Sequence, residues 1–131
     1  MNKTVYLGGP INGCTDEEAH GWREAVKPLL EAKGYDFLDP MERDYRGREM
    51  EPGIAAEIVG GDKEDICKSD VLLMSCPKPS VGTSMEVFYG WDIGLRVICV
   101  LPEGAVVSPW LKHHASEIFF GSEEEAVEEL L

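Results

Sequence analysis

The sequence has few basic residues and no long hydrophobic run. Its 131 residues include 12 lysine and arginine residues against 25 aspartate and glutamate residues, which gives a formal net charge of −13. A nucleic-acid polymer is bound through a basic face that neutralises phosphates, so this balance argues against such a partner. A single nucleotide held by local contacts remains compatible with it. No apolar run approaches the length of a membrane span, so we expect no membrane partner.

Targeting and cofactor signals are also missing. Met1-Asn2-Lys3 leads directly into the predicted fold without the pattern of a signal peptide, which favours a cytoplasmic location. The four cysteines show no CxxC spacing, so we expect free thiols with neither a metal nor a disulfide. The glycines after the first predicted strand do not form the GxGxxG fingerprint, and no cofactor is predicted.

The chain does contain a regular alternation of two kinds of segment. Short apolar runs predict strands at residues 4–7, 35–38, 71–76, 96–101 and 117–120. Apolar residues at helical spacing predict helices over residues 16–33 and 53–69, around 85–93, within 106–115 and over 123–131. Pro28 is expected to kink or split the first helix, and Gly60-Gly61 to interrupt the second. Residues 41–52 are charged and aperiodic, and a loop of this length is usually functional or disordered.

This alternation predicts the α/β class. The length fits one domain covering residues 1–131. We expect a Rossmann-like or flavodoxin-like three-layer sandwich with a mostly parallel sheet of about five strands. In such sheets ligands bind outside the carboxyl ends of the strands. Two turns are candidates for this position, at residues 8–13 and 79–83, and their strands could lie side by side.

Glu86 follows the second turn and allows two interpretations. Thr83-x-x-Glu86 has the spacing of a capping box, in which both side chains satisfy backbone N–H groups at a helix start. The same spacing occurs at Thr15-x-x-Glu18 and Ser122-x-x-Glu125, so spacing alone favours capping for Glu86. In the first turn of a helix below the ligand opening, however, a carboxylate is also well placed to act on a bound ligand.

Four motifs, taken together, carry a resemblance to a known family. In chain order they are Tyr6-Leu7-Gly8-Gly9-Pro10-Ile11, Tyr45-Arg46-Gly47, Asp62 eight residues before Asp70-Val71-Leu72, and Ser80-Val81-Gly82-Thr83-Ser84-Met85-Glu86. Each motif alone is weakly specific, but the ordered set is much more specific. From Tyr6 to about Lys112, the chain resembles the nucleoside 2-deoxyribosyltransferase superfamily.

The resemblance implies an enzyme that attacks an N-glycosidic bond with retention. Glu86 matches the family's nucleophilic carboxylate, which forms a deoxyribosyl ester at the anomeric carbon. Asp62 matches the acid that protonates the departing base, and Tyr6 matches the tyrosine that orients the nucleophile. These roles are coherent, because covalent capture divides one difficult displacement into two easier ones and the leaving base needs a proton. Without the resemblance, Tyr6 would be interpreted as a core residue and Asp62 as a surface or N-cap residue.

Two subfamilies differ at the 5′ end of the sugar. Base-exchanging transferases carry an acidic residue at the position of Ser80. Deoxynucleoside 5′-monophosphate N-glycosidases carry serine there, with a second serine from a neighbouring subunit, which Ser108 resembles. A serine accepts a phosphate that a carboxylate would repel. The chain departs from the hydrolases at Asn12, where they typically place an arginine, and Arg46 is a candidate replacement. The expected substrate-binding residues are Gly8, Gly9, Ile11, Asn12, Arg46, Ser80, Gly82 and Ser108.

The leading hypothesis is therefore a hydrolase that releases the base from a 2′-deoxyribonucleoside 5′-monophosphate. The alternatives are a transferase that exchanges bases between deoxyribonucleosides, and a non-catalytic nucleotide-binding module. The expected ligand is in each case a small nucleotide or nucleoside. We also expect a homodimer or higher homo-oligomer, because Trp91, Trp110 and Phe119-Phe120 are too many large rings for one small core. The resemblance implies that the active sites are shared between subunits. Ser108 is the residue expected to be donated across the interface.

Overall fold

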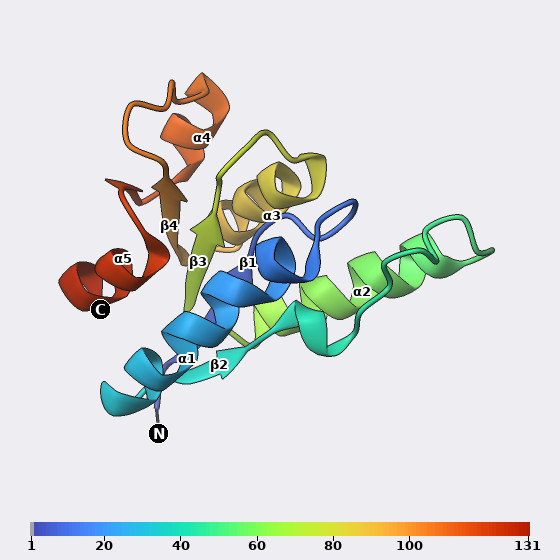
Figure 1. The fold of residues 1–131 in the computed structure, drawn as a ribbon, viewed down its shortest axis with the longest axis horizontal. Coiled ribbons are helices and arrows are strands. Elements are labelled where there is room, and N and C mark those ends of the chain that lie inside the picture. The colour runs from blue at the N-terminus through green and yellow to red at the C-terminus, as the bar shows by residue number, and fades with distance from the viewer. Residues whose placement is uncertain (1) are drawn as a thin grey trace.

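The computed structural model describes residues 2–131, and within them the strands form one five-stranded parallel sheet (Figure 1). The strand order is β2-β1-β3-β4-β5, and every neighbouring pair is parallel. This confirms the predicted α/β class and the parallel sheet. The strands are β1 (Thr4–Gly8), β2 (Asp36–Leu38), β3 (Val71–Ser75), β4 (Arg96–Leu101) and β5 (Glu117–Phe120).

Helices cover both faces of this sheet, as expected for a three-layer sandwich. One face is packed by α1 (Trp22–Ala32) and α5 (Glu123–Leu130), whose buried residues join the core cluster that contains Val5 and Leu7. The other face is packed by α2 (Ile54–Cys67), α3 (Val81–Asp92) and α4 (Pro109–His114). Two short segments complete the chain, a π-helical η1 (Glu17–Gly21) and a 3₁₀-helical η2 (Pro40–Glu42).

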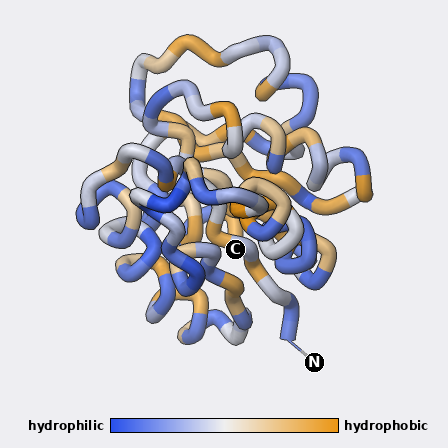
Figure 2. The backbone as a smooth tube through the Cα atoms, turned by 90° about the vertical axis from the view of Figure 1, so that its right-hand side faces the viewer, coloured by the Kyte–Doolittle hydropathy of each residue, from blue (hydrophilic) through white to orange (hydrophobic). Residues whose placement is uncertain are grey.

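The two faces are separated by the alternation of side chains along each strand. In β1, Val5 and Leu7 belong to the cluster under α1 and α5, whereas Tyr6 belongs to the cluster under α2 and α3. All five residues of β3 are buried, because a parallel strand covered on both faces has no solvated side. Figure 2 shows the resulting pattern, with hydrophobic segments through the middle of the molecule. No helix within residues 2–131 has the length and apolar character that crossing a bilayer requires.

The expected split at Pro28 is wrong, because α1 runs through this proline as one helix. A proline in a helix removes a hydrogen bond to the carbonyl of residue i−4, which is Glu24 here. Both Pro28 and Glu24 lie on the exposed side of α1, where water can satisfy that carbonyl. The departure from α-helical geometry comes earlier, in η1, which ends at Gly21.

The expected interruption at Gly60-Gly61 is also wrong, because α2 is continuous from Ile54 to Cys67. Gly60 is exposed, and a Cβ added to it would meet no atom within 4 Å. A Cβ added to Gly61 would lie 2.9 Å from Nε of Arg43. The second glycine therefore makes room for an arginine against the helix, one residue before Asp62.

Candidate active site

The two glycine-containing turns lie next to each other at the carboxyl edge of the sheet. β1 and β3 are neighbours, and Gly8 at the end of β1 pairs with Met74 of β3. A Cβ on Gly9 would lie 3.2 Å from Cβ of Ser75 and 3.3 Å from its carbonyl oxygen, so the glycine lets the first turn pack closely against the end of β3. From β1 the chain crosses to β2 on one side of β1, and it then returns to form β3 on the other side of β1. This is the switch point at which α/β sheets bind ligands.

The start of α3 is formed by the second turn. Ser80 is the N-cap residue, and its Oγ accepts a hydrogen bond of 3.4 Å from the backbone N–H of Thr83. Gly82 lies in the exposed first turn, so its N–H is among the donors that no helical carbonyl can satisfy. The positive end of the helix dipole therefore points to the edge where the two turns meet.

Glu86 lies one turn further along α3 and is bound by Tyr6. The Tyr6 hydroxyl donates a hydrogen bond of 2.5 Å to Oε2 of Glu86, across 80 residues of sequence. Tyr6 is completely buried, which confirms that it lies in the core, and its hydroxyl has the Glu86 carboxylate as its partner. This contact connects the end of β1 with the helix that follows β3.

The capping interpretation of Glu86 is wrong. Ser80 caps α3, and the Glu86 carboxylate is turned toward the sheet rather than back to the Thr83 N–H. The two other segments with the same spacing do form capping boxes. Thr15 and Glu18 exchange both hydrogen bonds, as do Ser122 and Glu125.

Burial raises the pKa of both Glu86 and Tyr6. Removal from water raises the pKa of the Glu86 carboxyl to about 8; the hydrogen bond from Tyr6 opposes this shift, the negative charge of Asp62 adds to it, and the charge of Arg23 opposes it. The pKa of Tyr6 is raised, first by burial and then by the charge of Glu86. Tyr6 is thus a neutral donor that keeps one carboxylate oxygen in place and leaves the other free.

Asp62 lies on α2, and its side chain is partly buried. Nη2 of Arg43 lies 3.3 Å from Oδ1 of Asp62 and 2.7 Å from Oδ2 of Asp65. Burial raises the pKa of Asp62, and the charge of Arg43 and its hydrogen bond oppose that effect. The charge of Asp62 also raises the pKa of both Glu86 and Tyr6, so the three groups form one electrostatic unit. The structure therefore brings together the three residues assigned to catalysis.

The remaining expected ligands are more scattered. Asn12 is exposed, whereas Ile11 packs on a small cluster of Cys14, Ala19 and Met41. Arg46 is held at 2.7 Å by both Asp44 and Asp16, with a further hydrogen bond to the Cys14 carbonyl. It therefore joins the long loop to the segment after β1, and its charge is shared by two carboxylates.

Ser108 lies on the far side of α3 from Asp62. It is exposed, it caps α4, and its Oγ accepts a hydrogen bond of 3.2 Å from the N–H of Trp110.

All four cysteines are free thiols, and Cys67 is the exposed one. Across residues 2–131, no group of three or more histidine, cysteine or acidic side chains could hold a metal ion.

Two arginines beside this site were missed by sequence reasoning. Arg43 lies in a loop, and nothing in the pattern relates it to Asp62. Arg23 follows Trp22 on α1, the helix that the apolar spacing over residues 16–33 predicts. A signal was present, because Arg23 lies four residues after Ala19 and three before Val26, which places it on the buried face.

Known proteins share the family and the fold of this chain. A family model described as nucleoside 2-deoxyribosyltransferase matches residues 5–127. Among solved structures, the chain is similar to the 2-deoxyribosyltransferase of Bacillus psychrosaccharolyticus, with a TM-score of 0.77, 18% identity, and coverage of 98% of this chain and 92% of that one. It is also similar to the CMP N-glycosidase BcmB of Clostridium botulinum, with a TM-score of 0.67, 19% identity and 98% coverage of both chains.

A conserved protein from Enterococcus faecalis V583 is a third similar structure, with a TM-score of 0.75, 16% identity, and coverage of 98% of this chain and 97% of that one. A search of curated protein sequences finds no match. At these identities the solved structures show the shared fold, and the family is shown by the match over residues 5–127. The chain belongs to the nucleoside 2-deoxyribosyltransferase family and is an enzyme of that type.

Proposed function

We propose that the protein hydrolyses the N-glycosidic bond of a 2′-deoxyribonucleoside 5′-monophosphate through a covalent deoxyribosyl–Glu86 intermediate. The observation that carries this proposal is the buried Tyr6–Glu86 hydrogen bond at the carboxyl edge of the sheet, with Asp62 acting on both groups. A surface carboxylate would need neither a buried tyrosine partner nor a second acid nearby. A retaining glycosidase needs a second carboxyl group near its nucleophile, and a fixed hydrogen-bond partner holds that nucleophile in one orientation.

In the first step, the free oxygen of Glu86 attacks the anomeric carbon from the face opposite the base. A carbon–oxygen bond forms while the carbon–nitrogen bond breaks, and its electron pair leaves with the base. The Asp62 carboxyl gives its proton to the departing base, because a neutral base is the better leaving group. Tyr6 holds the other Glu86 oxygen throughout, which fixes the direction of attack.

In the second step, water replaces the base on the same face of the sugar. The Asp62 carboxylate now accepts a proton from the attacking water, the ester bond to Glu86 breaks, and Glu86 leaves as a carboxylate. Two inversions give net retention at the anomeric carbon. If a second base takes the place of water, the same intermediate gives base exchange, so the competing reactions differ only in the acceptor.

The 5′ phosphate is assigned to the N-terminus of α3. A protein with a net charge of −13 repels a dianion overall, so the site must be built from local dipoles and hydroxyls. The Ser80 hydroxyl and the Gly82 N–H lie at this helix end, and the two residues are about 9 Å and about 6 Å along the axis from Glu86. The sugar would lie between them. Arg46 would reach the phosphate only by leaving Asp44 and Asp16, so it is the weaker candidate.

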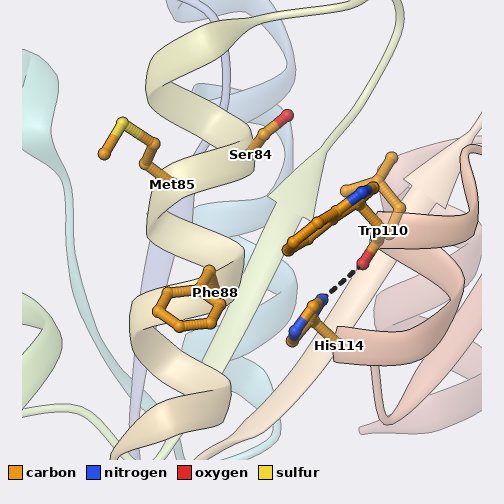
Figure 3. Close-up of a pocket in the computed structure, with 6 residues that line it drawn as sticks. Ser84, Met85, Phe88, Trp110 and His114 are labelled. Atoms are coloured by element: carbon orange, nitrogen blue, oxygen red, sulfur yellow. Dashed lines mark hydrogen bonds between the residues drawn. The ribbon is translucent and has the colours of Figure 1, made fainter.

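A homo-oligomer is proposed from the apolar surface of α3 and α4. Five large apolar side chains of these helices are exposed: Val81, Met85, Phe88, Trp91 and Trp110. Between the helices is a cavity of about 340 Å³ whose lining includes Phe88 and His114 (Figure 3). Such a patch on a small protein marks an interaction surface. Ser108 at the start of α4 borders it, in a position to be donated to a partner's site.

One experiment separates the competing functions. The protein is incubated with each deoxynucleoside and each deoxynucleoside 5′-monophosphate, with and without a second free base, and products are separated by chromatography. Free base released from a monophosphate without an acceptor supports the hydrolase. A new nucleoside formed only with an acceptor would replace it with the transferase. Ligand binding without either product would leave a nucleotide-binding module.

A further inference from the structure

Arg23 is the largest of the fully buried side chains, and the reaction described above does not use it. It projects from α1 on the opposite face of the sheet from Glu86. An arginine is rarely buried completely, because removing its charge from water is costly unless the charge is compensated. The contacts of its guanidinium group must therefore offset the cost of burying the charge.

The guanidinium group binds the backbone on both sides of Gly8. Nε donates to the Leu7 carbonyl at 3.1 Å, and Nη2 donates to the Gly9 carbonyl at 3.1 Å. Nη1 donates to the carbonyl of Ala19 in η1, at 2.5 Å. The rigid fork of donors thus connects the end of β1, the turn after it and the following helix. Gly9 lies in the turn that faces the proposed substrate, and Leu7 lies in β1 just before that turn and directly follows Tyr6.

The positive charge of Arg23 is only partly neutralised. Within residues 2–131, its ion-pair partner is Asp39, whose Oδ1 lies 3.6 Å from Nε of Arg23. The Asp39 carboxylate also binds two other groups. Lys27 binds its Oδ2 at 2.8 Å, and the Met41 N–H binds Oδ1 at 2.8 Å. The direct hydrogen bonds of Arg23 all go to neutral carbonyls, so its field reaches the neighbouring acids.

We propose that Arg23 is a positioning residue of this active site: it clamps the turn after β1, and its buried positive charge stabilises the Glu86 carboxylate that attacks the sugar. The inference rests on the proposed role of Glu86. Electrostatics agree with the geometry, because the charge of Arg23 lowers the pKa of both Glu86 and Asp62. Without it, burial would raise the pKa of Glu86 further, and a smaller fraction of the reactive carboxylate would be present at any given pH.

The test is the pH dependence of kcat/KM for three variants. Arg23→Gln keeps a donor for the turn but loses the charge, so the acid limb of the profile should move to higher pH by about one unit. The loss relative to the wild type is then about tenfold greater at low pH than at high pH. Arg23→Lys keeps the charge but not the fork, so kcat should fall while the acid limb stays in place. Lys27→Gln is the matched control, since it removes a charge from the same Asp39 and should leave the limb unmoved.

If Arg23→Gln lowers kcat/KM by the same factor at every pH, the charge of Arg23 does not act on Glu86, and the residue has a purely structural role. An Arg23→Lys variant with wild-type kcat and KM would overturn the clamp. If Arg23→Gln does not fold, the Glu86 carboxyl is titrated by ¹³C NMR in wild type, Arg23→Lys and Lys27→Gln. A Glu86 pKa that moves more in Lys27→Gln than in Arg23→Lys would contradict the assignment of the charge to Arg23. The same titration decides the inference if no substrate is cleaved, an outcome that would refute only the proposed function.

Discussion

The replacement Glu86→Gln should stabilise the protein in a pH-dependent way. The pKa of Glu86 is about 8 in the fold and 4.5 ordinarily, so the folded state holds this proton more tightly than the unfolded state. Its contribution to stability is complete below pH 4.5 and is lost as the pH rises through 8. A pKa moved from 4.5 to about 8 corresponds to a cost of at most about 5 kcal/mol above pH 8. Glutamine does not ionise, and its carbonyl oxygen can still accept the Tyr6 hydrogen bond.

Urea unfolding between pH 4 and pH 9, followed by circular dichroism, measures this effect. Wild type and Glu86→Gln should have similar free energies of unfolding near pH 4, and the variant should become more stable as the pH rises toward 9. Glu125→Gln is the matched control of opposite sign. Hydrogen bonds from Ser122 lower the pKa of Glu125, so this variant should be less stable than the wild type above pH 4.5, and the difference should shrink as the pH falls from 4.5 through the lowered pKa of the folded state. Equal stability of Glu86→Gln and wild type at pH 9 would refute the reasoning.

Three further variants probe the remaining assignments. Tyr6→Phe removes the hydrogen bond that orients Glu86 and should lower kcat about 10- to 100-fold, measured by base release at saturating substrate; a smaller loss would refute the orienting role. Ser80→Asp keeps an N-cap side chain, so stability should change by less than about 0.5 kcal/mol, whereas kcat/KM should collapse for the monophosphate and hold for the nucleoside. An equal change in kcat/KM for both substrates would contradict the assignment of the phosphate site to the start of α3. Trp110→Glu places a charge in the exposed apolar surface and should give an inactive monomer by light scattering; a wild type that is fully active as a monomer would contradict the shared site.

The sequence predicted the strands, the sheet type and the two turns well, because apolar runs and glycines report directly on burial and backbone shape. It also placed Tyr6, Asp62 and Glu86 in one site, but through family resemblance rather than periodicity. The helix interruptions at Pro28 and Gly60-Gly61 were mispredicted, since local propensity does not include a solvated carbonyl or the side chain of Arg43. The helical spacing places Arg23 on the buried face of α1, but the carbonyls that bind its guanidinium group are brought together only by the fold.

The covalent role of Glu86 is tested most directly by trapping the intermediate. A deoxynucleoside 5′-monophosphate carrying fluorine at the 2 position of the sugar should form the ester and then hydrolyse slowly, because fluorine destabilises the cationic transition state. Intact-mass measurement should show one sugar phosphate added per chain, and peptide mapping should place it on Glu86, with no addition to Glu86→Gln. A label found on another residue, or base release by Glu86→Gln at a near wild-type rate, would contradict the mechanism.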